Sequence, residues 1–307
     1  MGKIAIIFPG QGAQYPGMGK DLYEKSAAAR AVFHMADNRA EGTADLCFSG
    51  SAEALSITKN TQPALFAVDL ACAHALLQNG IKADCTAGFS LGEVVALAYS
   101  GMLSDEDAFD FVLERATVMH QVALETDGAM AAILKLSHNV VEDICAEFEQ
   151  VFPVNYNCPG QITVAGAAKE LDKFIMRVSE SGGRAIKLAV SGPFHSPFMT
   201  KAADQLDADF SALSFSPARI PVYSNVTARP YRNTDRELLF RQIKSPVRWE
   251  ETIKNMISDG VDTFIEAGPG RVLSGFVKRI SRDVRIMNAE CYEDILNIKK
   301  TLEVADL

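Results

Sequence analysis

The chain has 307 residues, of which 48% are hydrophobic and 22% are charged, and these proportions are typical of a folded globular protein rather than a disordered one. Its 30 basic and 39 acidic residues give a net charge of −9. This charge argues against a general nucleic-acid binder, because phosphate contacts need clustered Lys and Arg. No apolar stretch reaches the roughly 18 residues of a membrane span, so we expect no membrane association.

The cysteines and the N-terminus indicate the compartment. None of the six cysteines forms a Cys-x-x-Cys pair or lies at zinc-finger spacing from a histidine, so we expect neither a metal site nor a disulfide framework. The first apolar run, Ile4–Phe8, is too short for the core of a signal peptide. We therefore expect a cytoplasmic protein with reduced thiols.

The first 125 residues alternate between strand and helix patterns. Ile4–Phe8 is continuously apolar, as in a strand buried on both faces of a parallel sheet. A helix capped by Thr61 is predicted over Thr61–Gln78, with Asn79-Gly80 ending it. A short strand over Asp84–Ala87 and helices over Glu93–Tyr99 and Asp105–Glu125 follow. This alternation predicts an α/β fold.

The middle of the chain has a different order of elements. Its pattern is strand, helix, two strands, helix and strand, over Ala129–Leu136, Val140–Phe148, Val151–Tyr156, Gln161–Gly166, Lys169–Glu180 and Arg184–Val190. This βαββαβ order is that of the ferredoxin-like unit. We predict that residues 127–192 form such a subdomain, inserted into an α/β catalytic domain of residues 1–126 and 193–307. A strand over Asp262–Glu266 and a helix over Val272–Ile280 restore the α/β pattern after it.

A serine lies in a glycine-rich turn between a predicted strand and a predicted helix. The segment Gly88-Phe89-Ser90-Leu91-Gly92 has the Gly-x-Ser-x-Gly pattern of a nucleophile elbow, whose sharp turn needs small residues on both sides of the serine. The turn exposes the hydroxyl and directs the next N–H toward a reacting carbonyl. A glycine-rich turn with an incidental serine is the alternative.

A serine nucleophile needs a base, and the chain has five histidines. His34, His74 and His120 fall within helical patterns, and His138 lies among charged residues at a strand-to-helix turn. His195 lies in the rigid loop Ser191–Pro197, and loops on rigid scaffolds often carry catalytic groups. On pattern alone, a catalytic base and a structural histidine are equally good interpretations of His195.

Arg115 lies on the apolar face of its helix. A projection at 100° per residue places it among Ala108, Phe111, Val112, Ala116, Val118, Met119 and Val122. A guanidinium that points into a core must find an anion, because an unpaired buried charge is costly. The anion is either an Asp or Glu of the protein or a substrate carboxylate, which Arg binds in bidentate geometry.

The loop after the first strand, Gly10-Gln11-Gly12, lacks the third glycine of a dinucleotide-binding fingerprint. Its more useful feature is a backbone N–H that it offers at the mouth of a site.

Nine motifs in order resemble those of malonyl-CoA:acyl-carrier-protein transacylases and the acyltransferase domains of polyketide synthases. The resemblance covers residues 4 to 280, and the motifs begin at Phe8, Thr61, Gly88, Arg115, Gly128, Asn157, Gly192, Gln242 and Glu266. It implies an α/β-hydrolase-like core with a mostly parallel sheet and an inserted ferredoxin-like domain. It also implies malonyl transfer from malonyl-CoA to the phosphopantetheine thiol of acyl carrier protein, for fatty acid or polyketide synthesis.

The resemblance assigns roles to residues. It makes Ser90 the nucleophile, which forms a malonyl-enzyme, and His195 the base. The N–H groups of Gln11 and Leu91 form the oxyanion hole, and Arg115 pairs with the malonyl carboxylate.

Three further residues of the site follow from the same resemblance. The backbone carbonyl of Gln242 orients the histidine, while Gln62 and Phe194 belong to substrate binding. Leu91 and Phe194 resemble those of malonyl-selective members. No metal and no cofactor are implied, since the CoA thioester is the substrate, and we expect a monomer.

One residue departs from the family pattern: Phe89 stands where the family usually has histidine. The change affects contacts to the acyl group or pantetheine, not the Ser–His pair. Two other functions share these residues, namely a hydrolase, which gives no reason for Arg115, and a non-catalytic binding module. Within the family, service to a polyketide line or to malonate decarboxylation is also open.

Carrier proteins are acidic, so a partner with a charge of −9 needs a local basic surface. The candidates are Lys187, Lys278, Arg279 and Arg282, each of which is also an ordinary solvated residue taken singly.

Overall fold

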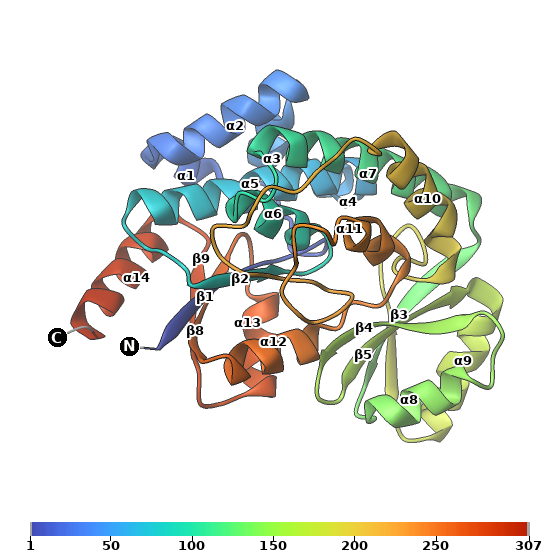
Figure 1. Cartoon of the computed structure of the whole chain (residues 1–307). Helices are drawn as coiled ribbons and strands as arrows, with labels where there is room; N and C mark the ends of the chain where they lie inside the picture. Colours follow the sequence, from blue (N-terminus) through green and yellow to red (C-terminus); the bar gives the residue numbers. More distant parts are fainter. Residues whose placement is uncertain (1, 306–307) are drawn as a thin grey trace.

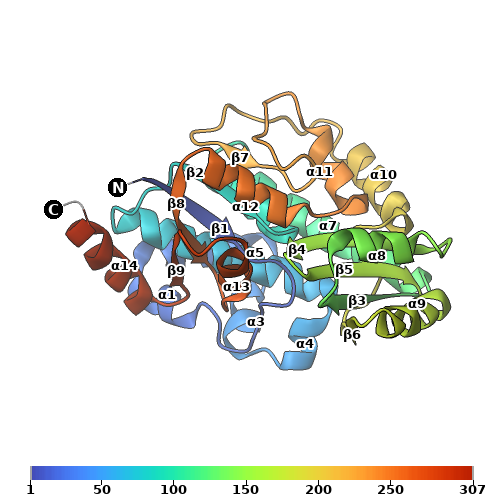
Figure 2. The same cartoon turned by 90° about the horizontal axis from the view of Figure 1, so that it is seen from below.

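The computed structural model describes residues 2–305, and within them the strands form two separate sheets (Figures 1 and 2). The larger sheet is parallel, with the order β7 (Val222–Tyr223), β2 (Cys85–Gly88), β1 (Lys3–Phe8), β8 (Val261–Ala267) and β9 (Arg285–Ala289). The smaller sheet is antiparallel, with the order β4 (Val151–Cys158), β5 (Gln161–Ala167), β3 (Gly128–Leu134) and β6 (Arg184–Lys187). The expected α/β architecture with a mostly parallel sheet is therefore confirmed. Residues 1, 306 and 307, at the ends of the predicted catalytic domain, lie outside the described residues.

The central strand β1 shows why its sequence is continuously apolar. Ile4, Ile6 and Phe8 join the core on one face of the parallel sheet, and Ala5 and Ile7 join the core on the other. Helices cover both faces (Figure 1), so neither set of side chains reaches water.

Most helices lie on one side of the parallel sheet. They are α1 (Lys20–Lys25), α2 (Ala27–Arg39), α3 (Thr43–Ser49), α4 (Ala52–Ser56), α5 (Thr58–Gln78), α6 (Leu91–Tyr99), α7 (Asp105–Glu125), α10 (Thr200–Asp209) and α11 (Glu237–Arg241). The opposite side is covered by α12 (Trp249–Ser258) and α13 (Val272–Ile280). The C-terminal α14 (Tyr292–Ala305) packs against β9 at the sheet edge. Two short 3₁₀ helices are η1 (Pro197–Met199) and η2 (Gln242–Lys244).

The smaller sheet carries its own two helices, α8 (His138–Cys145) and α9 (Ala168–Glu180). They pack with the sheet around a separate core that includes Ile133, Val141, Ile162 and Phe174. The chain order of this unit is β3, α8, β4, β5, α9 and β6, which is the order of strands and helices that the sequence predicts.

Some element bounds differ from the prediction. Helix α5 begins at Thr58, not at Thr61, and Pro63 lies inside it. The Thr61 hydroxyl does not cap the helix, because it donates backward to the carbonyl of Leu55 in α4, at 2.5 Å, and to the carbonyl of Ile57, one turn before, at 3.1 Å. The strand expected to reach Val190 ends at Lys187.

The carboxyl ends of the parallel strands lie at one edge and place their loops together. Phe8 of β1 is in register with Gly88 of β2, and Ala87 of β2 is in register with Tyr223 of β7. The loops that follow β1, β2 and β7 therefore start side by side. In open α/β sheets this edge is where ligands bind.

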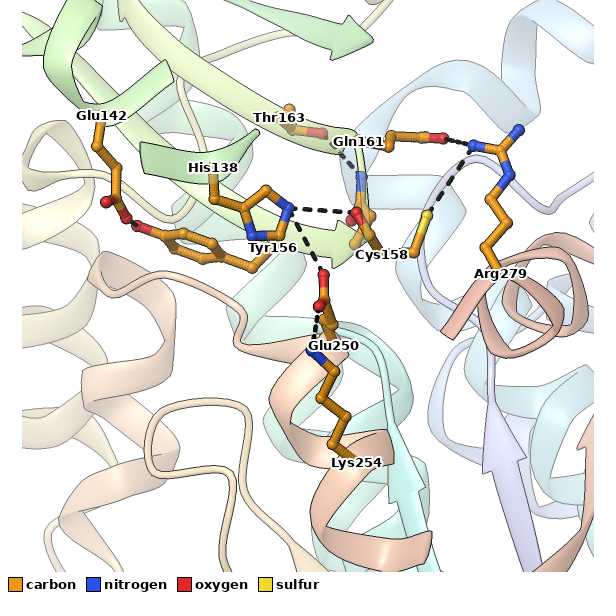
Figure 3. Close-up of polar contacts among 10 residues, drawn as sticks. His138, Glu142, Tyr156, Cys158, Gln161, Thr163, Glu250, Lys254 and Arg279 are labelled. Atoms are coloured by element: carbon orange, nitrogen blue, oxygen red, sulfur yellow. Dashed lines mark hydrogen bonds and ion pairs between the residues drawn. The ribbon is translucent and has the colours of Figure 1, made fainter. Parts of the chain in front are cut away.

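The smaller sheet is held against this edge through β4. The N–H of Tyr156 donates to the carbonyl of Val247 at 2.9 Å, and the N–H of Val247 donates to the carbonyl of Val154 at 2.8 Å. Figure 3 shows His138 Nε2 between the Cys158 carbonyl, at 3.2 Å, and Glu250 Oε2, at 3.6 Å. These contacts fix the smaller sheet as a second wall beside the edge.

Candidate active site

A pocket of about 90 Å³ lies between the two sheets at the carboxyl edge of β2. One wall comes from the parallel-sheet unit, and the other comes from Met130, Asn155, Leu188 and Val190. Seven residues expected at the site line this pocket: Gln11, Gln62, Ser90, Leu91, Arg115, Phe194 and His195. The eighth, Gln242, is buried and contacts them from behind. The structure thus brings together residues that the sequence separates by up to 231 positions (242 − 11).

The turn at Ser90 has the geometry of an elbow. Ser90 adopts φ 55° and ψ −103°, a conformation that is costly for a residue with a side chain. A Cβ added at Gly88 would lie 1.9 Å from the carbonyl carbon of Gly92. A Cβ at Gly92 would lie 2.3 Å from the carbonyl oxygen of Phe8, so the close approach of the strands and the helix requires both glycines.

Ser90 and His195 are in direct contact. Ser90 Oγ lies 2.7 Å from His195 Nε2, and His195 Nδ1 lies 2.9 Å from the backbone carbonyl of Gln242. A carbonyl only accepts hydrogen bonds, so we assign the ring proton to Nδ1 and the lone pair to Nε2. The Ser90 hydroxyl therefore donates to a nitrogen that can take its proton.

The surroundings keep His195 neutral. Burial, and next the charge of Arg115, lower the pKa of His195 to about 4. The imidazole is therefore in its base form at pH 7. His195 also has a positive φ of 60°, so Ser90 and His195 are two of the four non-glycine residues with positive φ in residues 2–305. Strain of this kind concentrates at functional sites.

Arg115 is 1% exposed and holds its guanidinium beside the Ser–His pair. Nη1 donates to Gln62 Oε1 at 2.5 Å, and Nη2 donates to Ser90 Oγ at 3.2 Å and to Gln242 Oε1 at 3.0 Å. Its Nε has no hydrogen-bond partner. Within residues 2–305 no carboxylate lies within 4.0 Å of this guanidinium. The structure therefore does not contain the internal salt bridge that was one of the two interpretations.

The charge of Arg115 persists in this environment. Burial lowers its pKa to about 10, opposed by the charge of Glu93. The group is still a cation at neutral pH. A buried cation held only by neutral amides and a hydroxyl is suited to receive an anion in the pocket.

Gln242 contributes more than its backbone carbonyl. Its side-chain Nε2 donates to the carbonyl of Ser90 at 2.7 Å, and its Oε1 accepts from Arg115. Sequence reasoning missed this side-chain role. It also missed Asn225, whose Oδ1 accepts from the N–H of Ser90 at 2.8 Å. Both residues lie more than 100 positions from Ser90, and no local pattern marks Asn225 or the role of the Gln242 side chain.

The two residues expected to supply backbone N–H groups, Gln11 and Leu91, line the same pocket. Leu91 is the first residue of α6, and N–H groups in the first turn of a helix have no partner within it. Gln11 lies three residues after the end of β1, and its side chain donates to Thr58 Oγ1 at 3.3 Å. The N–H of Ser90 itself is engaged by Asn225. The expected role of the N–H groups of Gln11 and Leu91 in binding a carbonyl oxygen stays a prediction.

Phe89 lines the same pocket as Ser90 and Arg115. Its ring packs against Trp249, at a centroid distance of 5.6 Å, and against Phe276, at 6.4 Å. It also lines a second pocket of about 210 Å³, which shares Gln11, Phe89, Asn155 and Leu188 with the first. The ring therefore borders both pockets beside the elbow.

Of the four basic residues expected to dock the carrier protein, three lie in one surface hollow and the fourth lies elsewhere. Lys278, Arg279 and Arg282 line one surface hollow of about 980 Å³ beside Pro159. Arg279 Nη1 is partly engaged there, because it donates to Gln161 Oε1 at 2.8 Å (Figure 3). Lys187 does not line this hollow and pairs with Asp172 at 2.5 Å.

Residues 2–305 contain neither a candidate membrane span nor a candidate metal site. No helix there has the length and hydropathy to cross a membrane. No group of three His, Cys, Asp or Glu side chains in that range could hold a metal ion.

Comparison with known proteins gives a consistent family. Residues 5–293 match the acyl transferase domain family. The chain is 42% identical to the malonyl CoA-acyl carrier protein transacylase of Bacillus subtilis, covering 99% of this chain and 98% of that protein. It is 38% identical to the protein of that name from Staphylococcus aureus, over 96% and 98% of the two chains.

Solved structures agree. The malonyl CoA-acyl carrier protein transacylase of Clostridium perfringens superimposes with a TM-score of 0.95 at 37% identity, covering 99% of this chain and 98% of that one. A malonyl-transacylase solved in complex with a type II PKS acyl-carrier protein superimposes with a TM-score of 0.94 at 33% identity, covering 97% and 99%.

Proposed function

The chain belongs to the acyl transferase family, and on that premise we propose that it transfers malonyl groups from malonyl-CoA to the phosphopantetheine thiol of an acyl carrier protein. It is an acyltransferase that supplies fatty acid or polyketide synthesis. Relatives that match nearly the whole chain carry the corresponding name, and one structural neighbour was solved with its carrier protein.

The observation that carries the substrate assignment is the buried Arg115 beside Ser90. Malonyl-CoA is a thioester with a free carboxylate three carbons from the sulfur, so its acyl group can offer an anion to the guanidinium while its thioester carbonyl meets the hydroxyl. A hydrolase of uncharged esters would give no reason to bury a cation at this position. Gln62 and Gln242 hold the guanidinium through their side-chain oxygens, which keeps it directed at the pocket.

Acylation follows from the geometry of the Ser–His pair. His195 Nε2 takes the proton of Ser90 Oγ as the oxygen attacks the thioester carbon. The N–H groups of Gln11 and Leu91 stabilise the oxyanion, and one such donor is typically worth about 3 kcal/mol of barrier. The carbon–sulfur bond then breaks, and His195 returns the proton to the CoA thiolate. The product is a malonyl ester on Ser90.

The second half of the cycle repeats the same steps with the carrier thiol. His195 takes the thiol proton, the thiolate attacks the malonyl ester, and Ser90 regains its proton. The two half-reactions share one nucleophile, which predicts ping-pong kinetics. The second pocket, with Gln11 and Leu188 in common with the first, gives the pantetheine arm a path to Ser90. Phe89 and Phe276 form an apolar side of that path.

The division of the chain into domains is part of this proposal. We assign residues 127–192 as a ferredoxin-like subdomain inserted between residues 1–126 and 193–307 of an α/β-hydrolase-like catalytic domain. The strand order β4-β5-β3-β6 and the chain order of the unit support this assignment. Phe194, which is buried at the pocket, follows the subdomain and restricts the room beside the acyl group, in keeping with malonyl selectivity.

The docking surface for the carrier protein, the oligomeric state and the compartment of the enzyme are also proposals. We assign docking of the acidic carrier to the hollow lined by Lys278 and Arg282, whose side chains are exposed. We also propose a cytoplasmic monomer without a cofactor. The six cysteines are all unpaired, in keeping with a reducing compartment, and every reacting group in the scheme comes from one chain.

The test is a mass measurement on the enzyme. With malonyl-CoA alone, the protein should gain one adduct of about 86 Da, as expected for a covalent malonyl intermediate, and peptide mapping should place it on Ser90. The Ser90→Ala variant should gain none. Adding holo carrier protein should discharge the adduct onto the carrier thiol. An adduct that survives in Ser90→Ala, or one that only water removes, would contradict the proposal.

A further inference from the structure

The strained turn at Ser90 must be held by its surroundings, and the structure shows what holds it. A positive φ at a serine persists only where neighbouring groups over-determine it. Gly88 and Gly92 make the turn possible by leaving room. Room alone does not fix the direction of Ser90, so the contacts to its peptide groups decide where the hydroxyl points.

One buried amide spans the turn. Asn225 is 0% exposed, and its Oδ1 accepts from the N–H of Ser90 at 2.8 Å. Its Nδ2 donates to the carbonyl of Gly88 at 2.7 Å. The last residue of strand β2 and the serine two positions later are thus held by the two ends of the same side chain.

The position of Asn225 follows from the topology. It lies two residues after the end of β7, as Ser90 lies two residues after the end of β2. The two strands are parallel and paired with Ala87 opposite Tyr223. The two loops therefore leave the same edge at the same level and meet.

Asn225 is itself anchored to the helix that Ser90 precedes. Its backbone N–H donates to Glu93 Oε2 at 2.5 Å, and the hydroxyl of Tyr231 donates to Glu93 Oε1. Glu93 is 0% exposed and lies in the first turn of α6. The contacts close a ring from Ser90 through Asn225 and Glu93 back to α6.

We propose that Asn225 is a positioning residue for the nucleophile. It acts through Ser90 and has no contact with the reacting atoms, and the assignment rests on the proposed role of Ser90. Losing its side chain leaves the N–H of Ser90 and the carbonyl of Gly88 without partners and frees the turn to relax. A shift of about 1 Å in a reacting group can cost about 100-fold in rate. We expect a loss of this order in the acylation step, with malonyl-CoA binding almost unchanged.

The experiment compares Asn225→Ala with Asn255→Ala. Asn255 Nδ2 donates to the carbonyl of Ala228 at 2.8 Å, so it anchors the same loop without touching the elbow. Rapid-quench mass spectrometry gives the acylation rate constant at saturating malonyl-CoA and the concentration for half-saturation. We expect Asn225→Ala to lose about 100-fold in the rate constant and less than about 3-fold in half-saturation. Asn255→Ala should keep both.

A second variant supports the test if Asn225→Ala folds poorly. In Asn225→Asp, the introduced carboxyl can replace both hydrogen bonds only when protonated, because the carbonyl of Gly88 needs a donor. Its acylation rate should fall as pH rises from 5 to 8, whereas wild type, whose base titrates near pH 4, should stay level.

The outcomes separate the two claims. If wild-type protein forms no adduct on Ser90, the proposed function fails. If wild type is acylated and Asn225→Ala matches it, or if Asn255→Ala loses as much, the positioning role is overturned. A level pH profile for Asn225→Asp would overturn it as well.

Discussion

Replacing Arg115 by methionine tests whether the buried cation selects the malonyl group. Methionine keeps an unbranched side chain in a fully buried position and removes only the charged group. The variant should lose malonyl transfer far more than acetyl transfer, because acetyl-CoA has no carboxylate to pair. The acetyl reaction uses the same Ser90 and His195, so it reports any general damage to the site.

The structure sets the size of the effect. Arg115 is 1% exposed and has no carboxylate within 4.0 Å in residues 2–305. A bound malonyl carboxylate would therefore be desolvated with the guanidinium as its counter-charge. Removing one partner of a buried ion pair costs about 3–5 kcal/mol. Since about 1.4 kcal/mol is a factor of ten in rate, the ratio of malonyl to acetyl kcat/KM should fall by at least about 100-fold.

The loss common to both substrates is also predictable. Arg115 donates to Ser90 Oγ, and its charge helps to lower the pKa of His195. Without it, the acid limb of the acetyl reaction should move toward higher pH. The assay is the steady-state rate with each acyl-CoA at fixed holo carrier protein, measured between pH 4 and 8. Equal losses for the two acyl groups would refute the carboxylate role, even if both were large.

Three further predictions concern titration, stability and docking. The neutral base form of His195 exists above its pKa of about 4, so kcat/KM for acylation should be level from pH 8 to 6 and fall only near pH 4; a midpoint near 6.5 would contradict this assignment. Asp69 is fully buried without a hydrogen-bond partner, and burial raises the pKa of its carboxyl well above the ordinary value. The folded state therefore loses stability as pH rises from the pKa of Asp69 in the unfolded chain to its pKa in the folded protein. The loss is up to about 1.4 kcal/mol per pH unit. In urea unfolding, the free energy of unfolding of Asp69→Asn should therefore rise relative to that of wild type as pH rises from 5 to 7. A difference between the two proteins that stays constant over this range would contradict the prediction. Replacing Lys278 and Arg282 by Glu should raise the KM for carrier protein and leave the acylation of Ser90 by malonyl-CoA unchanged. The same charge change at Lys299 and Lys300 of α14 serves as the control. Equal effects of the two pairs on the KM would contradict the assignment of carrier docking to this hollow.

The elements that the sequence predicts well are those set by local patterns. Helices α7 and α13 have the predicted bounds, because each has a clear apolar face and a clear end. Strand β1 is recognisable from its continuous apolar run. The sequence predicts the start of helix α5 three residues late, because Thr61 resembles a cap although its hydroxyl donates backward to the carbonyls of Leu55 and Ile57. A side chain that can both cap and donate to the preceding turn gives no local sign of which it does.

Strand β7 marks the limit of local reasoning. It has two residues, Val222 and Tyr223, too few for any period to appear. It exists because β2 offers it an edge, and that edge belongs to a segment more than 130 positions earlier. The position of the loop after β7, which carries Asn225, therefore cannot be predicted from local sequence patterns.

The residues of the site likewise fall into those that local sequence patterns reveal and those that only long-range contacts reveal. Ser90, His195 and Arg115 each break the pattern of their own segment: a hydroxyl in a glycine turn, an imidazole in a proline-flanked loop, a cation on an apolar face. Residues that break local rules mark function, because a folded chain tolerates such conflicts mainly where they serve a purpose. Asn225 and the side chain of Gln242 break no rule, since a polar side chain in a loop or a short helix is ordinary. Their role comes from contacts across 135 and 152 positions, so only the assembled sheet could reveal them.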